Sequence, residues 1–504
     1  MRACLAFSLV LFAAAAFARA AEERVPATLV VLKAPAEGRG DTVCRFGVPL
    51  RRGRLRDADQ IALLDGEKEV PCGAEAIAKW PDGSIRAVAV RFRTSAAKGE
   101  KALQIAIGRK RTAGANIPPP KSSAAMPDAF VKLPPEFLCD SAAFGGAILP
   151  ASKTDISKDL DKRLPNDLEA SVWSAVQSGK MPTDYDRGLH DFFYYDLAHS
   201  TYSQYARTGL PNLFITGYAA ARTYREEMVI HEGAKKGRPR GTPGEEIIPE
   251  EGLRTMYIEG LLDDWQLTGD GRSMEVAREI ADAYVENLPR QGRNLRVNER
   301  NPGWPLLELT YFYDVTREKR YLDSAALVFE DVLKWQDETG AWLRVYEDKD
   351  ECPHGCRGAQ PFMHTLLVEG IVRYWRLTGD ERAKACLKKA AAWLLTPAAG
   401  WRESQGAWRY LPGCISSKDK DGVPDLSLII AQSLAVGWQL TGEVKYRNAA
   451  LKAFEAGVAR GNIGNGKQFS QDYRNSAYCI AYLSAEPGTY GPERESTGAA
   501  DKDK

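Results

Sequence analysis

Hydrophobic residues follow two different periods along the chain, and the change between them divides it into two regions. From residue 27 to residue 110, apolar positions alternate with small or polar ones, as in 87–92 and again in 103–107. Turn pairs such as Asp65-Gly66 separate these runs. A period of two residues is typical of strands with one buried face. This region therefore predicts a small antiparallel β-domain.

Beyond a Pro- and Ser-rich stretch at 111–130, the apolar residues take up the period of a helix. Consecutive prolines at 118–120 favour an extended spacer there, which we interpret as an interdomain linker. From 131 to 485, apolar residues recur at i, i+3, i+4 and i+7, as at 258, 261, 262 and 265. This pattern indicates helices with one buried face.

A short motif recurs in the helical region, consisting of an aromatic residue, two further residues, Thr, and Gly or a substitute. Full copies begin at Trp265, Trp375 and Trp438, and weaker copies begin at Tyr205 and Tyr313. In the full copies Gly can end one helix, and the acidic residue after it can cap the next. Helical hairpins of this kind bury their remaining apolar surface by stacking on neighbouring hairpins.

The predicted fold class is multidomain α+β, with a small antiparallel β-domain followed by an all-α (α/α)5–6 toroid of helical hairpins. Five copies of the motif and a further helix near 473–483 favour a closed ring, with an open array as the alternative. Connections within hairpins are short, whereas the long connections fall between them, at 232–250, 289–303, 336–361, 396–424 and 460–471. In a ring these long loops share one rim, beside the N-termini of the inner helices. Functional residues concentrate on loops held by a rigid scaffold, so this rim is the predicted site.

The ends of the chain and its charge bear on where it acts. Residues 1–20 have the features of a secretory signal, with Arg2 before an apolar run and small residues at 18 and 20. We expect a secreted or periplasmic mature protein with no membrane association after cleavage, and a flexible tail at 486–504. Loss of the two leader arginines changes the formal net charge from +1 to −1. That balance argues against nucleic acid as a partner, because phosphate binding needs a basic surface.

Two stretches resemble the exo-rhamnogalacturonan lyase-like family. Residues 46–50 and the string Trp-Pro-Asp-Gly-Ser-Ile-Arg at 80–86 resemble the RIFT-barrel domain that begins these proteins. Residues 361–370 and the Thr-Gly-Asp repeats resemble the α/α-toroid domain that follows it. The resemblance implies a secreted enzyme that cleaves a uronate-containing, pectin- or rhamnogalacturonan-like glycan by β-elimination. The histidines that such toroids often carry before the second inner helix are reduced here to His231.

β-Elimination needs a cation beside the uronate carboxylate, a base for the neighbouring proton and an acid for the leaving oxygen. Residue types suited to these roles occur at or near the predicted rim. The predicted catalytic residues are His190, Tyr194, His231, Arg254 and His364. The predicted substrate-binding residues are Arg187, Trp304, Asp425, Asp472, Tyr473 and Arg474. Each of them also has an ordinary structural interpretation, as a helix cap, a surface ion pair or a core side chain.

Two other functions fit the same sequence. A glycoside hydrolase would use two carboxylates, and Glu250, Glu251, Asp425 and Asp472 all fall at predicted starts of inner helices. A non-catalytic glycan-binding protein would use the rim as a recognition surface and the β-domain as a docking module. The predicted partner is an acidic polysaccharide or oligosaccharide.

Signals for metals are weak. Cys352, His354 and Cys356 share one loop, but a C-x₃-C spacing without a second pair is a poor zinc site, and a disulfide or free thiols fits better. Residues 419–425 resemble the opening of a calcium loop, yet Ile430 stands where the bidentate acid should be. We therefore predict no metal or cofactor, with calcium at 419–425 as the weak alternative.

Overall fold

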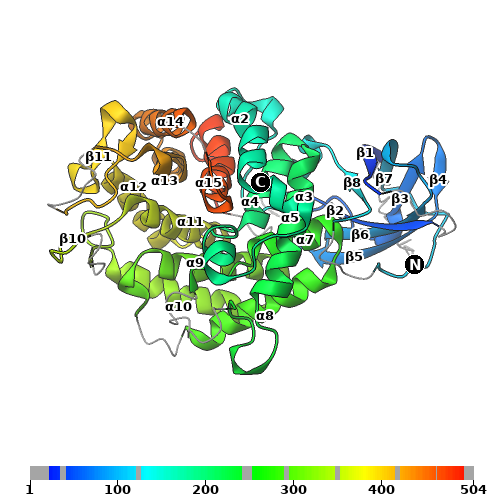
Figure 1. Ribbon diagram of the computed structural model, residues 1–504, viewed down its shortest axis with the longest axis horizontal. Coiled ribbons are helices and arrows are strands. Elements are labelled where there is room, and N and C mark those ends of the chain that lie inside the picture. Colours follow the sequence, from blue (N-terminus) through cyan, green and yellow to red (C-terminus); the bar gives the residue numbers. More distant parts are fainter. Residues whose placement is uncertain are drawn as a thin grey trace, which may run out of the picture.

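The computed structural model describes residues 22–33, 41–120, 126–240, 253–288, 294–346, 352–414, 421–460 and 463–492. The predicted signal at 1–20 lies outside these residues, as does the tail from 493 onwards. Figure 1 shows an N-terminal β-domain beside a larger domain of helices. Among the described residues, no helix has both the length and the apolar character needed to cross a membrane.

The β-domain consists of two antiparallel sheets. The larger has the strand order β4-β3-β7-β1-β8, and the smaller has the order β2-β6-β5. The strands are β1 (Glu23–Val31), β2 (Thr42–Pro49), β3 (Ile61–Asp65), β4 (Lys68–Val70), β5 (Cys72–Lys79), β6 (Ile85–Thr94), β7 (Gly99–Ile107) and β8 (Ala129–Lys132). Strand β8 pairs with β1, so the end of the predicted linker belongs to this domain.

Strand β6 departs from the predicted alternation because both of its faces are covered. Its first six residues, 85–90, are all buried. Val88 pairs with Val48 of β2 and belongs to the core of the domain. Ala89 lies against the toroid, where a Cβ built on Gly269 would be 2.7 Å from the Cβ of Ala89. The small residues of this strand therefore allow close contact with the helices.

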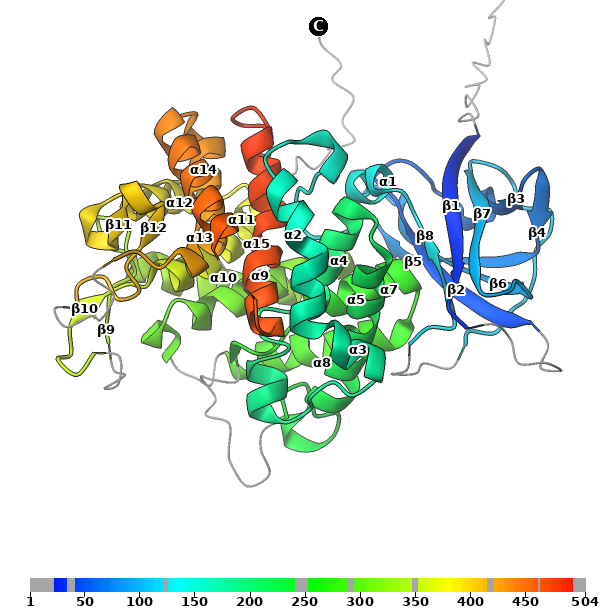
Figure 2. The ribbon, with the colours of Figure 1, turned by 45° about the horizontal axis from the view of Figure 1, so that its top comes forward.

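The helical domain is a ring of inner helices surrounded by outer ones. The inner helices are α4 (Leu197–Thr208), α7 (Glu259–Thr268), α9 (Arg300–Thr316), α11 (Pro361–Thr378), α13 (Ser427–Thr441) and α15 (Gly466–Ser484). The outer helices are α2 (Lys158–Leu168) with its continuation α3 (Ser174–Ser178), α5 (Pro211–Thr223), α8 (Gly271–Asn287), α10 (Lys319–Trp335), α12 (Glu381–Leu394) and α14 (Val444–Ala459). Helix α15 packs against both α13 and α4, and Figures 1 and 2 show it between them. The ring is closed, as predicted.

The repeated motif forms the short turn from each inner helix to the next outer one. Gly269 adopts a φ of 67°, and its N–H donates to Trp265 O at 2.8 Å. The motif threonine joins the two helices: Thr268 Oγ1 donates to Asp264 O and accepts from Asp270 N. In the turn from α9 to α10, Arg317 replaces the glycine and adopts the same left-handed conformation.

The β-domain lies to one side of the toroid (Figure 2), where its strands contact helices α7 and α9. Arg86 of β6 is fully buried, and its Nη1 lies 2.7 Å from Asp314 Oδ2 at the end of α9. The loop at 141–148 lies across the base of the ring, where Phe144 O accepts from Tyr478 Oη and Ala143 O accepts from Tyr311 Oη. The opposite end carries the long connections, which leaves that rim for a site.

Candidate functional site

Three of the predicted catalytic residues lie together on the rim. The ring centroids of His190 and Tyr194 are 5.2 Å apart, and Arg254 is an electrostatic neighbour of His190. Two residues that were not predicted complete the group. Arg300 Nη1 donates to Tyr194 Oη at 2.8 Å, and Lys467 Nζ lies 5.4 Å from the centroid of the Tyr194 ring. We call these five residues the rim cluster.

The chain between α3 and α4 positions the first half of the rim cluster. A π-helical turn, Tyr185–His190, begins with the Asp184 side chain accepting from Arg187 N. Tyr195 and Asp196 then adopt left-handed conformations, with φ of 66° and 58°. Such strain in non-glycine residues persists only where surrounding contacts hold it, and it is frequent at functional sites. Here Asp196 caps α4 through His199 N and also accepts from Gly260 N at 2.8 Å.

Helix α15 positions Lys467 by approaching this segment closely. Lys467 N donates to Asp191 O at 2.9 Å. The preceding Gly466 permits the approach, because a Cβ at that position would lie 2.2 Å from Phe192 O. Arg300 comes from the first turn of α9. The rim cluster therefore draws on two inner helices, α9 and α15, and on the segments that precede α4 and α7.

The rim cluster has an excess of positive charge. Burial lowers the pKa of His190, and the charges of Arg254, Lys467 and Arg300 lower it further. The pKa of Lys467 is also lowered, by burial and then by Arg300. Within the described part of the chain, no carboxylate lies within ion-pair distance of Arg300 or Lys467, although the charge of Asp191 acts on His190 and Lys467 and partly opposes the cations. A neutral imidazole, a phenol and half-buried cations at one place suit the binding of an anionic group.

An aromatic layer lies beneath the rim cluster. Tyr195 packs on Tyr194 with centroids 4.7 Å apart, and Tyr257 packs on Trp304 at 5.0 Å. Trp304 was predicted to contact substrate, but it is fully buried. Its indole supports the residues above it instead of stacking on a sugar.

Arg474, also a predicted substrate-binding residue, belongs to a buried charge network on the axis of the ring. It bonds Glu259 of α7 and Glu369 of α11, and Arg373 bonds Glu259 as well. Burial raises the pKa of Glu259, but Arg373 and Arg474 outweigh it and lower the value to about 2. All four side chains are buried. The network holds inner helices together, so Arg474 has a structural role here.

Two predicted histidines lie away from the rim cluster. His364 is fully buried between Trp342 and Trp393, with centroids 4.6 and 4.7 Å from its ring, in the wall between α11 and α12. Burial lowers its pKa to about 3. His231 Nδ1 lies 2.7 Å from Glu279 Oε2 of the outer helix α8. The prediction that these residues face one rim with His190 is not supported.

The remaining predicted residues form separate ion pairs and hydrogen bonds. Arg187 is exposed and pairs with Asp184. Asp472 is buried and pairs with Arg163 and with Arg460; burial raises its pKa to about 7, although both arginines oppose this. Asp425 pairs with the same arginine, with its Oδ2 at 3.6 Å from Arg460 Nη1. Tyr473 Oη donates to Asp167 Oδ2 at 2.6 Å. None of these contacts joins the rim cluster.

Three cysteines from two rim loops could hold a metal ion. The thiols of Cys352, Cys356 and Cys414 all lie within 4.8 Å of one another, and the sulfurs of Cys352 and Cys414 are 3.1 Å apart. Tyr410 contacts this group and stacks on Phe362 at 5.4 Å. The sequence showed the first two cysteines but not the third, which is 58 residues beyond Cys356. Thiolates suit soft ions such as Zn²⁺.

Some predicted residues lie outside the described part of the chain. Glu250 and Glu251, two of the four carboxylates suggested for a hydrolase, are among them, and so is the start of the possible calcium loop at 419–420. Arg300 and Lys467 were missed for a different reason. Each is a single basic residue in the first turn of an inner helix, and only the loop-length argument, applied to every inner-helix start, would have indicated them.

Two family models match parts of the sequence. Residues 27–106 match the PcRGLX-like N-terminal RIFT barrel domain. Residues 253–451 match the β-L-arabinofuranosidase GH127 catalytic domain. Each covers less than half of the chain. No curated protein matches the sequence.

Solved structures with a similar helical domain are distant in sequence. A glycosyl hydrolase family 88 protein from Bacteroides vulgatus is 13% identical, with a TM-score of 0.46 over 64% of this chain and 99% of that one. The α-1,6-mannanase GH76A from Salegentibacter sp. is 13% identical, with a TM-score of 0.43 over 65% and 99%. An unsaturated glucuronyl hydrolase from Streptococcus agalactiae is 11% identical, with a TM-score of 0.44 over 68% and 99%.

The two family models match the two domains of the fold, one model to each domain. The N-terminal region matches a RIFT-barrel domain, as the sequence resemblance implied, and the toroid matches a glycoside hydrolase domain where that resemblance implied a lyase. The lyase subtype is therefore not confirmed. At this level the chain is a glycan-degrading enzyme built on an α/α toroid.

Proposed function

We propose that this protein is a glycoside hydrolase that cleaves a glycan at the long-loop rim of its toroid and binds an anionic sugar through the rim cluster. The observation that carries the proposal is the convergence of Arg300, Lys467 and Arg254 around Tyr194, with no described carboxylate paired to the first two. The match of residues 253–451 to a GH127 catalytic domain supports hydrolysis as the reaction. Its description makes arabinose-containing glycans the first substrates to test.

The rim cluster can bind a carboxylate in a directed way. A guanidinium offers two parallel donors to a carboxylate, and a lysine adds a point charge. The Arg300 guanidinium is held in place by Tyr194 on one side and lies 5.9 Å from the Phe362 ring. A sugar acid or an acidic neighbour of the cleaved sugar would therefore be oriented by Arg300 and Lys467 before any bond breaks.

The proton transfers of hydrolysis need further groups. His190 is half-buried with a lowered pKa, so near neutral pH its imidazole is uncharged, and we propose it as the group that accepts a proton from water or a hydroxyl. Glu250 and Glu251 immediately precede the segment that carries Arg254 in the sequence. We propose them as the carboxylates to test for the acid and base roles of a glycosidase.

β-Elimination is the second candidate function, favoured by a half-buried, neutral His190 beside the cations. An imidazole can take up a proton beside a neutralised carboxylate. Tyr194, which packs on His190, is fully buried and supports the cluster from beneath. We also propose export of the mature protein to the periplasm or the medium, on the basis of residues 1–20.

One assay separates the two reactions. The mature protein is incubated with pectic, arabinan and uronate-containing glycans, and both new reducing ends and the ultraviolet absorbance of unsaturated uronate products are measured. Hydrolysis gives reducing ends without absorbance, which is the expected result. Reducing ends with matching absorbance would establish elimination instead. Glu250→Gln and Glu251→Gln variants should then abolish activity only if hydrolysis is the reaction.

A further inference from the structure

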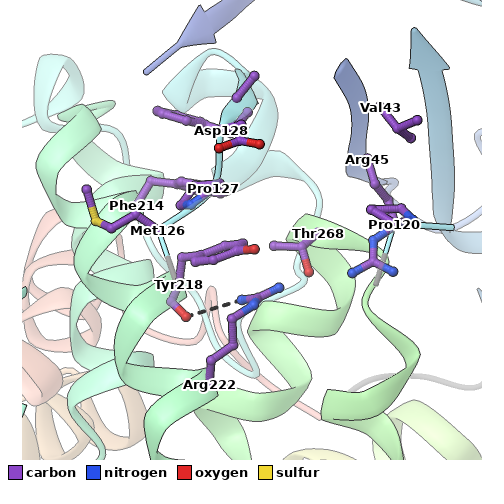
Figure 3. A pocket seen from close by; sticks show the side chains of 12 residues that line it. Val43, Arg45, Pro120, Met126, Pro127, Asp128, Phe214, Tyr218, Arg222 and Thr268 are labelled. Carbon is purple, nitrogen blue, oxygen red and sulfur yellow. Dashed lines mark hydrogen bonds between the residues drawn. The ribbon is translucent and has the colours of Figure 1, made fainter. Parts of the chain in front are cut away.

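We propose that a pocket between the β-domain and the toroid is a second glycan-binding site, which takes neutral sugar residues of the polymer cleaved at the rim. This inference rests on the proposed function, because both take the ligand to be a glycan. Figure 3 shows the pocket from close by. Its volume is about 320 Å³, which lies at the lower end of the size range typical of small-molecule sites.

Both domains contribute to the pocket wall. Val43 comes from β2, Pro127 and Phe130 come from β8 and the segment before it, and Phe214 comes from α5. The domains are joined rigidly nearby, since Arg45 of β2 pairs with Asp270 at the start of α8 at 3.1 Å. The part of the wall formed by β2 and the end of α7 is therefore fixed, which lowers the cost of ordering it around a ligand.

Tyr218 of α5 provides a fixed aromatic surface in this pocket. The guanidinium of Arg222, one turn later, lies 3.2 Å from the centroid of the Tyr218 ring. Arg222 is itself buried and held by Asp264 at 2.6 Å and by Asp270 at 3.0 Å. Figure 3 shows the Tyr218 ring above Arg222, with its hydroxyl directed toward the space between Thr268 and Asp128. The apolar face of a sugar packs well on such a ring, and the ring edge leaves its hydroxyls free to bond.

Polar side chains line the pocket around that ring. Asp128 is exposed, and no described side chain pairs with its carboxylate. Its backbone is fixed, since Asp128 O accepts from Leu32 N and Lys33 N. Arg45 lies on the other side of the pocket from Asp128 (Figure 3), with its guanidinium paired to Asp270. A carboxylate and a guanidinium that flank an aromatic ring can bond vicinal hydroxyls, as recognition of a sugar requires.

The charge balance favours a neutral sugar over an anion. Three arginines lie at or just beneath the pocket, at 45, 222 and 225, and four acidic residues oppose them, Asp128, Asp264, Asp270 and Glu226. No positive formal charge is left in excess. This differs from the rim cluster, where cations are in excess. The two sites therefore select different parts of one heteropolysaccharide.

The position of the pocket indicates what binding there does. Thr268, in its wall, ends inner helix α7, so the pocket lies at the turn end of the toroid and the rim cluster lies at the other end. The inner helix α9, with 17 residues, is about 25 Å long at 1.5 Å per residue. A single short oligosaccharide would not occupy both sites at once. The pocket therefore anchors a long chain without touching the bond that is cleaved.

Affinity electrophoresis of the full mature chain in gels containing arabinan, galactan or homogalacturonan tests this inference. We expect at least one neutral glycan to retard the wild-type protein, and Tyr218→Ala and Asp128→Ala to weaken that binding by about tenfold or more. Asp128 is exposed, so its variant should fold even if Tyr218→Ala does not. Tyr313→Ala is the matched control, because Tyr313 is a half-buried tyrosine at the same end of the toroid with Arg317 over its ring.

The outcomes separate this inference from the proposed function. Retardation that persists in both pocket variants, or retardation by homogalacturonan alone, would overturn the second site, and so would no retardation by any of the three glycans. Arg300→Gln should lose cleavage and keep retardation. If no glycan is cleaved but retardation still depends on Tyr218, the second site stands while the proposed hydrolase activity fails.

Discussion

At the scale of single residues, the rim cluster makes the protonation of His190 depend on its neighbours. Burial and three positive charges lower the pKa of this imidazole. Replacing Lys467 by Gln removes one of those charges, so the pKa of His190 should rise toward its ordinary value. Titration followed by histidine NMR can measure this, since the chain has only five histidines. Lys445→Gln, on the outer helix α14, is the control; an unchanged His190 pKa in Lys467→Gln would contradict the described cluster.

The three clustered cysteines allow a second prediction at this scale. Purified under reducing conditions, the protein should bind about one zinc ion per chain, because three thiolates within reach of one ion make a strong partial site. Elemental analysis measures the zinc, and Cys414→Ser should remove it. Cys479→Ser, buried in α15, should not. A metal-free protein in which mass spectrometry finds Cys352 and Cys414 joined as a disulfide would contradict the prediction.

At the scale of elements, two glycines in equivalent turns differ in their surroundings. Gly269 and Gly379 both have a φ of 67°, so an alanine at either costs about 1–2 kcal/mol of backbone strain. A Cβ at 379 meets nothing within 4 Å, whereas one at 269 presses on Ala89 of the β-domain. Overpacking adds about 1–3 kcal/mol. Gly269→Ala should therefore lower the free energy of unfolding more than Gly379→Ala in urea denaturation; equal losses would contradict the close domain contact.

The elements were predictable where a local pattern determined them. Thr268, Gly269 and their repeats marked the turns, because a left-handed cap and a threonine bridge leave a sequence signature. The faces of the helices were harder to predict. His364 lies in the first turn of an inner helix as expected, yet its side chain points into the outer layer. Successive residues of a helix point about 100° apart, so a shift of one position decides whether a side chain faces the rim or the wall. Contacts such as Arg300 with Tyr194 join residues 106 positions apart, and no local signal indicates them.

At the scale of the whole molecule, one buried arginine joins the two domains. Arg86 is fully buried and bonds Asp314 and Gln266 of the toroid. Its loss leaves Asp314 paired with Arg317 at 2.7 Å, with Arg376 as a further positive neighbour. Arg86→Ala should therefore destabilise the protein by about 3–5 kcal/mol. Differential scanning calorimetry should show the β-domain unfolding apart from the toroid, and a single unshifted transition would contradict the role given to this contact. Arg91→Ala, on the same strand with only the exposed Glu75 as its paired acid, is the control.

The two ends of the toroid carry different proposed binding sites. The turn end contacts the β-domain and the loop at 141–148, and it carries the pocket proposed for neutral sugars. The rim end carries the cations and the thiols. A polymer with neutral and acidic sugars would contact both ends, and the rim cluster is the proposed place of cleavage.

The most direct test of that claim is the steady-state kinetics of Arg300→Gln and Lys467→Gln on the glycan found by the product assay. Loss of a charge-assisted contact to the substrate anion should lower kcat/KM by roughly 10- to 100-fold. On a carboxyl-reduced form of that glycan, both variants should have the same kcat/KM as the wild type. Arg382→Gln, an exposed arginine of α12, should match the wild type on both. Unchanged kinetics in both rim variants, or equal losses on the acidic and the reduced glycan, would contradict the account.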